Sequence, residues 1–144
     1  MYLKRLADLS GGPTSCWRAY AICDEGGQCD LDEEIAQLLA DATAARAMRS
    51  LLALLESCLA EPEGPQLYIG TLMCHEAVAG AQIYEFIKGP LRLYWFYGAD
   101  RRVIIIPGIL RKKQQTTPRK IERMLRKAKQ DYLAAHTQGT LNYY

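Results

Sequence analysis

The chain has 144 residues, 49% hydrophobic and 24% charged, and carries a formal net charge of +2. This length fits one domain, residues 1–144, around a single core. No run of about 18 or more apolar residues occurs, and the first residues lack the apolar segment of a signal peptide. We therefore expect a cytoplasmic protein without membrane contact. The five cysteines include no Cys-x-x-Cys pair, which argues for reduced thiols and against a zinc site or a complete disulfide framework.

The small net charge hides a division between the two halves of the chain. Residues 1–70 hold five Lys and Arg against eleven Asp and Glu, whereas residues 71–144 hold thirteen against five. The halves therefore carry −6 and +8. A solvated basic face would explain an isolated charge run, but cations clustered in one half favour contact with a polyanion, specifically nucleic acid.

The chain begins with two weakly marked segments. Leu3, Leu6 and Leu9 are spaced for one side of a short helix, which the Ser-Gly-Gly-Pro run at 10–13 would stop. Residues 1–14 are therefore interpreted as a lead-in segment. Residues 16–23 predict a strand whose alternate residues lie on opposite sides.

A long helical region follows. Asp30, with Glu33 three residues later, predicts an N-cap and capping box. Apolar residues then recur at three- and four-residue steps up to Glu61, which is typical of amphipathic helix covering one face of a sheet. No Gly or Pro divides the region, so one long helix remains open beside two. Residues 41–45 are the candidate break.

Residues 62–81 carry mixed signals. The Pro-Glu-Gly-Pro run at 62–65 closes the helical region, residues 68–69 and 71–72 have strand character, and residues 75–76 resemble a loop. His75 could serve as an acid or base. It has no identifiable partner in the sequence, so we interpret it as incidental.

Residues 83–118 hold the strongest signals. Residues 83–88 stop at Gly89-Pro90, residues 91–97 follow, and a Gly-Ala-Asp turn precedes the apolar run 102–106. These features predict an antiparallel meander, whose third strand Pro107-Gly108 would end or bend. A polar, cationic loop then begins at residues 111–113.

The last helix is predicted to start with Thr117 as N-cap and Pro118 as its first residue. Its inward stripe comprises Ile121, Met124, Leu125, Ala128 and Tyr132. Its remaining surface is basic and comprises Arg119, Lys120, Arg123, Arg126, Lys127 and Lys129. The tail 136–144 is either disordered or returns Tyr143 and Tyr144 to the domain.

Several of these features occur in a recognisable order. They are Tyr84-Glu85, Arg92-Leu93-Tyr94 before a glycine turn, a hydrophobic strand, Lys112-Lys113, and Thr117-Pro118 opening a basic helix. This order resembles the HigB-like branch of the RelE/ParE toxin superfamily, over the last two thirds of the chain. The resemblance implies a RelE-like α+β fold: an antiparallel sheet with two helices from the N-terminal half, forming a hairpin, on one face, and a basic C-terminal helix.

These relatives are the toxin halves of bacterial toxin–antitoxin pairs. The resemblance implies an endoribonuclease that cleaves mRNA on the ribosome, needs no metal or other cofactor, and is held inactive by a cognate antitoxin. The residues agree, because the chain has no Ser-His-Asp order, glycine-rich phosphate loop or His/Cys metal cluster. RNA supplies its own nucleophile, the 2′-hydroxyl, so a cationic surface that positions and stabilises it is sufficient.

Four residues are the catalytic candidates. Arg92 would clamp a phosphate, although a cross-strand ion pair with Glu85 is equally compatible with the sequence. Lys112 and Lys113 would stabilise charge or exchange a proton, and His136 offers an imidazole. The expected RNA contacts are Lys88, Tyr94, Arg111, Arg119, Arg123, Arg126 and Tyr132. Tyr94 or Tyr132 would stack on a base, with core packing favoured for Tyr132.

One position departs from the family pattern. Ile87 stands two residues after Glu85, where these toxins often carry an arginine, and Lys88 is the nearest substitute. The departure keeps two other functions open. One is a ParE-like inhibitor that binds DNA gyrase without catalysis, and the other is a basic nucleic-acid-binding regulator.

Overall fold

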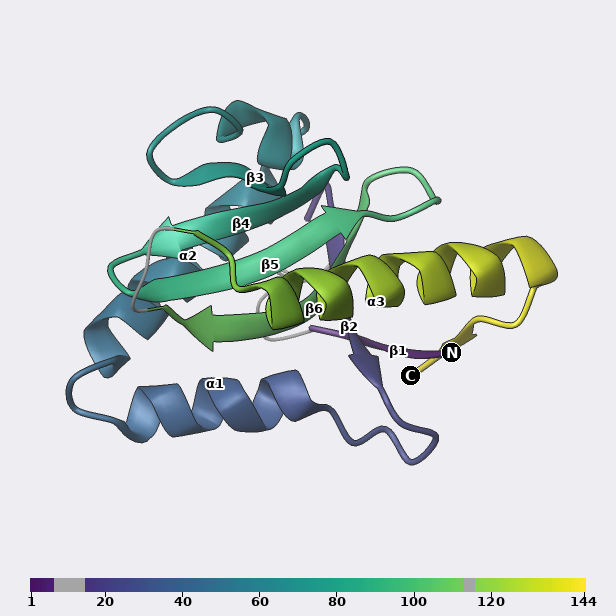
Figure 1. Cartoon of the computed structure of the whole chain (residues 1–144), viewed down its shortest axis with the longest axis horizontal. Helices are drawn as coiled ribbons and strands as arrows, with labels where there is room; N and C mark the ends of the chain where they lie inside the picture. The colour runs from purple at the N-terminus through teal and green to yellow at the C-terminus, as the bar shows by residue number, and fades with distance from the viewer. Residues whose placement is uncertain (7–14, 113–115) are drawn as a thin grey trace.

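The computed structural model describes residues 1–6, 15–112 and 116–144. In this part of the chain the fold is α+β, with three α-helices around one seven-stranded sheet of order β3-β4-β5-β6-β2-β1-β7 (Figure 1). The sheet is mostly antiparallel, but β2 pairs with β6, and β1 with β7, in parallel.

The elements follow one another along the chain in a simple order. They are β1 Tyr2–Arg5, β2 Arg18–Cys23, α1 Asp30–Ala40, α2 Ala45–Ala60, the 3-10 helix η2 Gly64–Leu67, β3 Cys74–Val78, β4 Ile83–Lys88, β5 Leu91–Tyr97, β6 Val103–Arg111, α3 Arg119–Gln138 and β7 Asn142–Tyr143. None of these helices is long and apolar enough to span a membrane.

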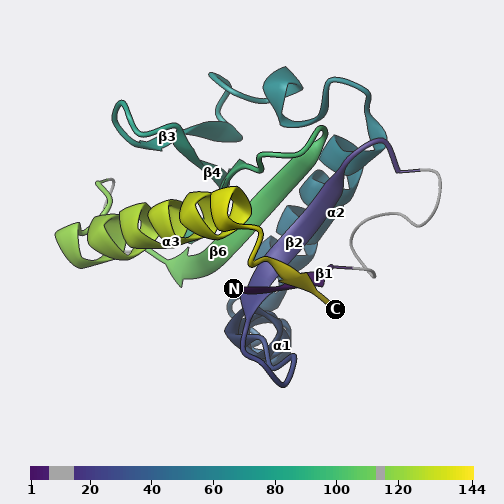
Figure 2. The same ribbon diagram turned by 90° about the vertical axis from the view of Figure 1, so that its right-hand side faces the viewer.

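Helices lie on both faces of the sheet. The hairpin of α1 and α2 covers one face and α3 runs along the other (Figure 2). Strand alternation divides β5 between two cores, because Leu93 and Trp95 pack under α2, whereas Tyr94 and Phe96 pack under α3. The side chains of β5 therefore alternate between the two cores, and both faces of the strand are buried.

The helical region divides at the candidate break, which confirms two helices. Asp41 ends α1 with an extended backbone (ψ 115°), and its carboxylate accepts hydrogen bonds from the Thr43 N–H at 2.8 Å and the Thr43 hydroxyl at 2.7 Å. This local turn replaces the helical pattern. The predicted capping box is wrong, since α1 starts at Asp30 itself after Cys29, with no side-chain cap.

The N-terminal segment is a strand and not the predicted short helix. Leu3 is fully buried, and β1 pairs with β2 from Tyr2 opposite Cys23 to Arg5 opposite Tyr20. The three-residue leucine spacing suggested a helix. In the strand that forms instead, alternate residues face the core, and Leu3 is one of them. Leu9 lies outside the described residues.

The predicted meander of β4, β5 and β6 is confirmed, but its third strand is longer than expected. β6 continues through Pro107 to Arg111, and its register against β5 shifts between Tyr94 and Phe96. The shift is a bulge, where proline is tolerated because no ladder hydrogen bond from its nitrogen is required. Pro107 therefore bends the strand without ending it.

Two further segments differ from the sequence-based prediction. His75 and Glu76 belong to strand β3 and not to a loop. The residues with strand character before them, Ile69 and Thr71, make only isolated bridges to Cys74. Pairing with β4 therefore determines which residues form this strand, and the local β-propensity does not.

The last helix begins and ends differently from the prediction. Pro118 is its N-cap, and the Thr117 hydroxyl donates to the Ala77 carbonyl at 3.1 Å, so Thr117 ties the segment before α3 to β3. Met124 is 41% exposed, although it was expected in the inward stripe. α3 extends to Gln138, so the imidazole of His136 lies on a helix and not in a tail.

The C-terminal tail returns to the domain, as one of the two alternatives predicted. β7 pairs with β1, and the Tyr143 and Tyr144 rings lie 5.3 Å and 5.8 Å from those of Tyr20 and Tyr2. The two ends of the chain accordingly lie side by side in both views (Figures 1 and 2).

Candidate active site

Four residues form a row across the sheet on the face that α3 covers. His75 on β3 stands opposite Glu85 on β4, Glu85 stands opposite Tyr94 on β5, and Tyr94 stands opposite Gly108 on β6. Directly opposed residues share a face, so their side chains point the same way. Tyr94 packs in the core under α3, which identifies that face.

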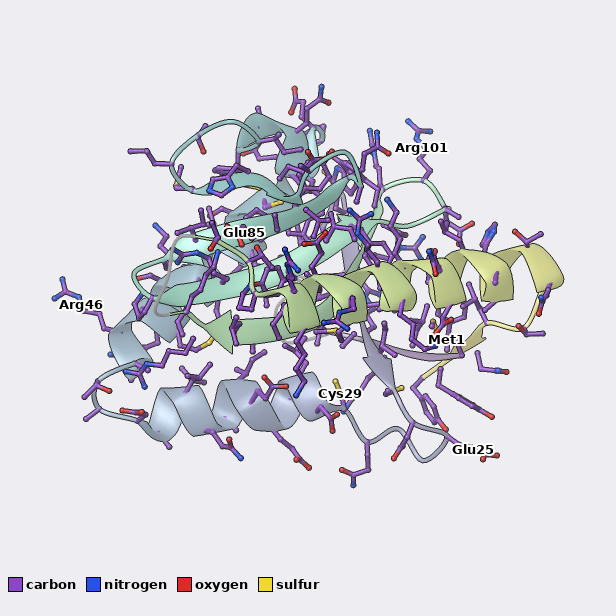
Figure 3. All side chains as sticks on the ribbon, in the orientation of Figure 1. Met1, Glu25, Cys29, Arg46, Glu85 and Arg101 are labelled. Carbon is purple, nitrogen blue, oxygen red and sulfur yellow. The ribbon has the colours of Figure 1, made fainter. Side chains whose placement is uncertain are left out.

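Glu85 is the centre of this row and is 1% exposed (Figure 3). Its Oε1 lies 3.6 Å from His75 Nδ1 and 3.8 Å from Arg92 Nε, and its Oε2 lies 3.9 Å from Lys112 Nζ. Three cationic or potentially cationic groups thus surround one buried carboxylate. We name His75, Glu85, Arg92, Tyr94 and Lys112 the Glu85 cluster.

The contacts of Glu85 are electrostatic and too long for hydrogen bonds. Among the described residues, Glu85 Oε2 and Arg92 Nε have no hydrogen-bond partner. Burying a carboxylate costs several kcal/mol unless nearby charge compensates. Native proteins leave few buried polar atoms unpaired, and each such atom calls for an explanation, of which a functional role is one. The Glu85 cluster therefore has the composition expected of a site and not only of a core.

The guanidinium group of Arg92 is held by the β4–β5 turn. Its Nη1 donates to the carbonyl oxygens of Gly89 at 2.7 Å and Leu91 at 3.0 Å. The ion pair with Glu85 that the sequence allowed is present at 3.8 Å. The turn engages Nη1, and Nε lies beside Glu85.

Burial shifts the titration of two members of the cluster. It lowers the pKa of the Lys112 ammonium; Glu85 opposes this shift and Arg92 adds to it. Burial also raises the pKa of Tyr94 to about 12, and the nearby Glu85 carboxylate contributes. Tyr94 is therefore protonated at neutral pH, whereas Lys112 releases its proton more easily than an exposed lysine.

The structure brings two of the four catalytic candidates together. Arg92 and Lys112 both face Glu85, while Lys113 lies outside the described residues. His136 is remote from them, because its Nε2 lies 3.6 Å from Asp100 Oδ1, beyond the opposite end of β5. The seven residues of β5 separate the two places by roughly 20 Å. His136, expected as a catalytic candidate, therefore lies outside the Glu85 cluster.

Two of the expected RNA contacts lie on the other face of the sheet. Arg111 donates to Asp41 at 2.9 Å and to Thr43 at 2.7 Å, which fixes it to the turn between α1 and α2. Lys88 stands opposite Leu91, a residue of the core under α2. Strand alternation separates both cations from the cluster, so Lys88 does not replace the arginine missing at Ile87.

The two tyrosines proposed to stack on a base are buried. Tyr94 is 1% exposed and Tyr132 is fully buried. The Tyr132 hydroxyl accepts a hydrogen bond from the Ala99 N–H at 3.0 Å, and its ring lies 5.7 Å from that of Phe96. Core packing, the alternative favoured for Tyr132, is what the structure shows, and neither ring offers a face to a base.

The basic surface of α3 is divided between paired and unpaired cations. Arg126 binds Glu122 at 3.2 Å, and Lys127 binds Asp131 at 2.6 Å. Within the described residues, the exposed Arg119, Lys120 and Arg123 make no ion pair. These three lie in the first turns of α3, directly after the Thr117 contact with β3.

The sequence missed the roles of His75 and Glu85 because it did not identify β3. Pairing of β3 with β4 brings the two side chains together across ten residues of sequence. The alternation of β4 could have placed Glu85 on the same face as Arg92, but nothing local indicates that this face is covered.

The described residues contain no group of three His, Cys, Asp or Glu side chains arranged to hold a metal ion. No protein-family model matches the chain, and no curated protein matches it. The site therefore has to be interpreted from its own geometry.

Proposed function

We propose that this chain is the toxin of a type II toxin–antitoxin system, a RelE-like endoribonuclease of the HigB-like branch that cleaves mRNA on the ribosome. One observation carries the proposal: a buried cationic cluster, Arg92 and Lys112 around Glu85, lies beside the segment that leads into the exposed cations of α3. This arrangement suits a phosphodiester backbone that enters along α3.

The chemistry needs few protein groups because RNA contains its own nucleophile. The 2′-oxygen must be aligned with the scissile phosphate, and the added negative charge of the transition state must be stabilised. Arg92 and Lys112, with Lys113 next in the chain, would supply this charge. Arg119 and Arg123 would hold neighbouring phosphates. A guanidinium group suits this task because its planar set of N–H donors matches the oxygens of a phosphate.

Glu85 has a specific part in this proposal. It compensates Arg92 and Lys112, yet its oxygens lie 3.8 Å and 3.9 Å from their nitrogen atoms. A phosphate oxygen at hydrogen-bonding distance would be a better acceptor for Arg92 than this carboxylate. Arg92 Nε is thus held beside the carboxylate without a hydrogen bond among the described residues.

A second function is favoured by the burial of the same groups. The side chain of Lys112 is 2% exposed and that of Arg92 is 13% exposed. If burial keeps Arg92 and Lys112 from contacting the nucleic acid, its principal contacts would be Arg119, Lys120 and Arg123. The chain would then bind without cleaving, either as a regulator or, in the ParE-like alternative, by blocking DNA gyrase.

Mapped mRNA cleavage distinguishes these functions. Purified protein is added to a translating extract and cuts are located by primer extension, with Arg92→Lys, Arg92→Ala and Lys112→Ala/Lys113→Ala beside the wild type. We expect cuts within translated frames that disappear in these variants. Arg101→Ala, an exposed arginine in the β5–β6 loop, is the matched control and should cut normally. Protection by a co-expressed neighbouring gene product would identify the antitoxin.

Intact message during active translation would reject the ribonuclease. Two measurements then separate the remaining functions. Inhibition of gyrase supercoiling would indicate the ParE-like activity. A regulator would show RNA or DNA affinity that falls steeply with salt, and Arg119→Ala/Lys120→Ala/Arg123→Ala would reduce the slope for single strands by about 2.

A further inference from the structure

His75 is the accessible member of the Glu85 cluster. Its side chain is 51% exposed, against 2% for Glu85 and 13% for Arg92. It lies on β3, which forms one edge of the sheet, so no further strand covers it in the described structure. A substrate that approaches the cluster from solvent would therefore meet this imidazole first.

The neighbours of His75 determine which ring nitrogen carries the proton. Nδ1 lies 3.2 Å from the carbonyl oxygen of Glu76 and 3.6 Å from Glu85 Oε1. A carbonyl oxygen can only accept a hydrogen bond, and a carboxylate has the same preference. The proton of the neutral ring is therefore placed on Nδ1. Nε2, on the far side of the ring, keeps its lone pair and can accept a proton.

The charges around His75 come from every neighbouring strand. Glu76, beside it on β3, is turned into the β3–β4 turn, where its carboxylate accepts the N–H groups of Gly80 and Gln82, both at 3.0 Å. Glu85 on β4 thus remains the carboxylate that faces the ring, and behind it stand Arg92 from β5 and Lys112 after β6.

We propose that His75 is the general acid–base residue of the RNA-cleaving centre and that Glu85 is its positioning residue. This inference rests on the proposed function and adds the group that carries the proton. His75 Nε2 accepts the proton of the 2′-hydroxyl while the 2′-oxygen bonds to phosphorus. The bond from phosphorus to the 5′-oxygen breaks, and His75 returns the proton to that oxygen.

The proton balance of this sequence is complete. One proton leaves the 2′-oxygen and one reaches the 5′-oxygen, so no water or other reactant is consumed. The products are a 2′,3′-cyclic phosphate and a 5′-hydroxyl. A carboxylate that orients an imidazole and stabilises its charged form is an established arrangement for such proton transfer.

The proposed course of the RNA along α3 is consistent with a role for His75. Ala77, at the register shift of β3 two residues beyond His75, packs against the core under α3, and its carbonyl oxygen accepts the Thr117 hydroxyl. The exposed Arg119 and Lys120 follow at once. A strand of RNA held by these cations passes the edge where His75 is exposed.

The first test observes the protonation of the His75 ring by NMR and does not depend on cleavage of RNA. The chain has two histidines, so a ¹⁵N correlation spectrum of the imidazoles is simple, and His136→Gln assigns it. We expect the neutral His75 ring to carry its proton on Nδ1. Glu85→Gln should weaken this preference, whereas Asp100→Asn should leave it unchanged. A ring protonated on Nε2 in the wild type would overturn the inference.

The second test measures cleavage of mRNA by the wild type, His75→Gln and Arg101→Ala, with a melting curve for each. The loss expected for His75→Gln is about 10²- to 10⁴-fold in rate, the usual contribution of a general acid–base residue. The pH profile of the residual rate should differ from that of the wild type, which a merely structural role of His75 would not produce. Arg101→Ala should cleave normally, and wild-type fragments should end in 2′,3′-cyclic phosphate.

The outcomes separate the two proposals. Wild-type cleavage with an equally active, folded His75→Gln would overturn the role of His75 and leave the ribonuclease standing. Absence of cleavage by the wild type would reject the ribonuclease, and the acid–base role with it. Fragments that end in a 3′-hydroxyl would also reject transfer of the phosphate to the 2′-oxygen.

Discussion

The chain's two histidines make the same contact in opposite surroundings. His75 and His136 each place a ring nitrogen 3.6 Å from a carboxylate oxygen, one of Glu85 and the other of Asp100. The side chain of Glu85 is 2% exposed, and two further cations face it. The side chain of Asp100 is 56% exposed, and among the described residues its ion pair is this surface contact with His136.

Burial, and not distance, distinguishes the Glu85 cluster from the surface contact at Asp100. Water weakens the interaction of Asp100 with His136, because charges in a high dielectric contribute little. The Glu85 carboxylate has lost its water, so its neighbours must compensate its charge. Removing a partner should therefore lower the free energy of unfolding strongly at the Glu85 cluster and only slightly at the contact between Asp100 and His136.

The largest difference is expected between Glu85→Ala and Asp100→Ala. Glu85→Ala leaves Arg92 and Lys112 buried without their carboxylate, which should lower the free energy of unfolding by about 3–5 kcal/mol. Asp100→Ala should change it by less than about 0.5 kcal/mol. Urea denaturation of both variants measures the difference. Equal stabilities would show that the cluster is well hydrated and would remove the basis of the comparison.

Arg92→Ala should have the next largest effect. It removes one of three groups that compensate Glu85, together with two hydrogen bonds to the β4–β5 turn, and should cost about 2 kcal/mol of unfolding free energy. Arg101→Ala, an equal truncation of an exposed arginine, should be close to neutral. The same urea series tests both, and a neutral Arg92→Ala would contradict the compensating role.

Tyr94→Phe should reveal the burial of the cluster at alkaline pH. Burial raises the pKa of Tyr94 to about 12 in the folded chain, whereas an unfolded tyrosine titrates near 10. The unfolded state therefore loses its proton first, and wild-type stability falls as pH rises through this window. Relative to Tyr94→Phe, the wild type should lose about 1 kcal/mol between pH 10 and 11. A constant difference would show that the hydroxyl reaches solvent.

The smallest effect is expected for His136→Gln. Its partner Asp100 is exposed and makes no second ion pair among the described residues, so the free energy of unfolding should change by less than about 0.5 kcal/mol. His75→Gln, measured alongside, should cost more because Glu85 is buried. If His136→Gln proved the more costly of the two, burial of the carboxylate would not be the deciding factor.

Local sequence signals predicted those elements whose boundaries depend on near neighbours. Gly89 adopts φ 51°, and the hairpin there turns where Gly-Pro predicted it. Asp41 breaks the helical region through its own side chain. The segments at Leu3 and His75 were misassigned, because each is a strand only through pairing with a distant partner.

The sequence by itself determined the meander, the amphipathic helical region with its candidate break, and the basic last helix. These follow from periodicity, turn residues and composition, which act over a few residues. The tertiary structure alone decided which charged groups meet. Glu85 faces His75, Arg92 and Lys112 because strand register and the position of α3 enclose one face of the sheet. Burial of a charge depends on what covers it, and no local pattern contains that information.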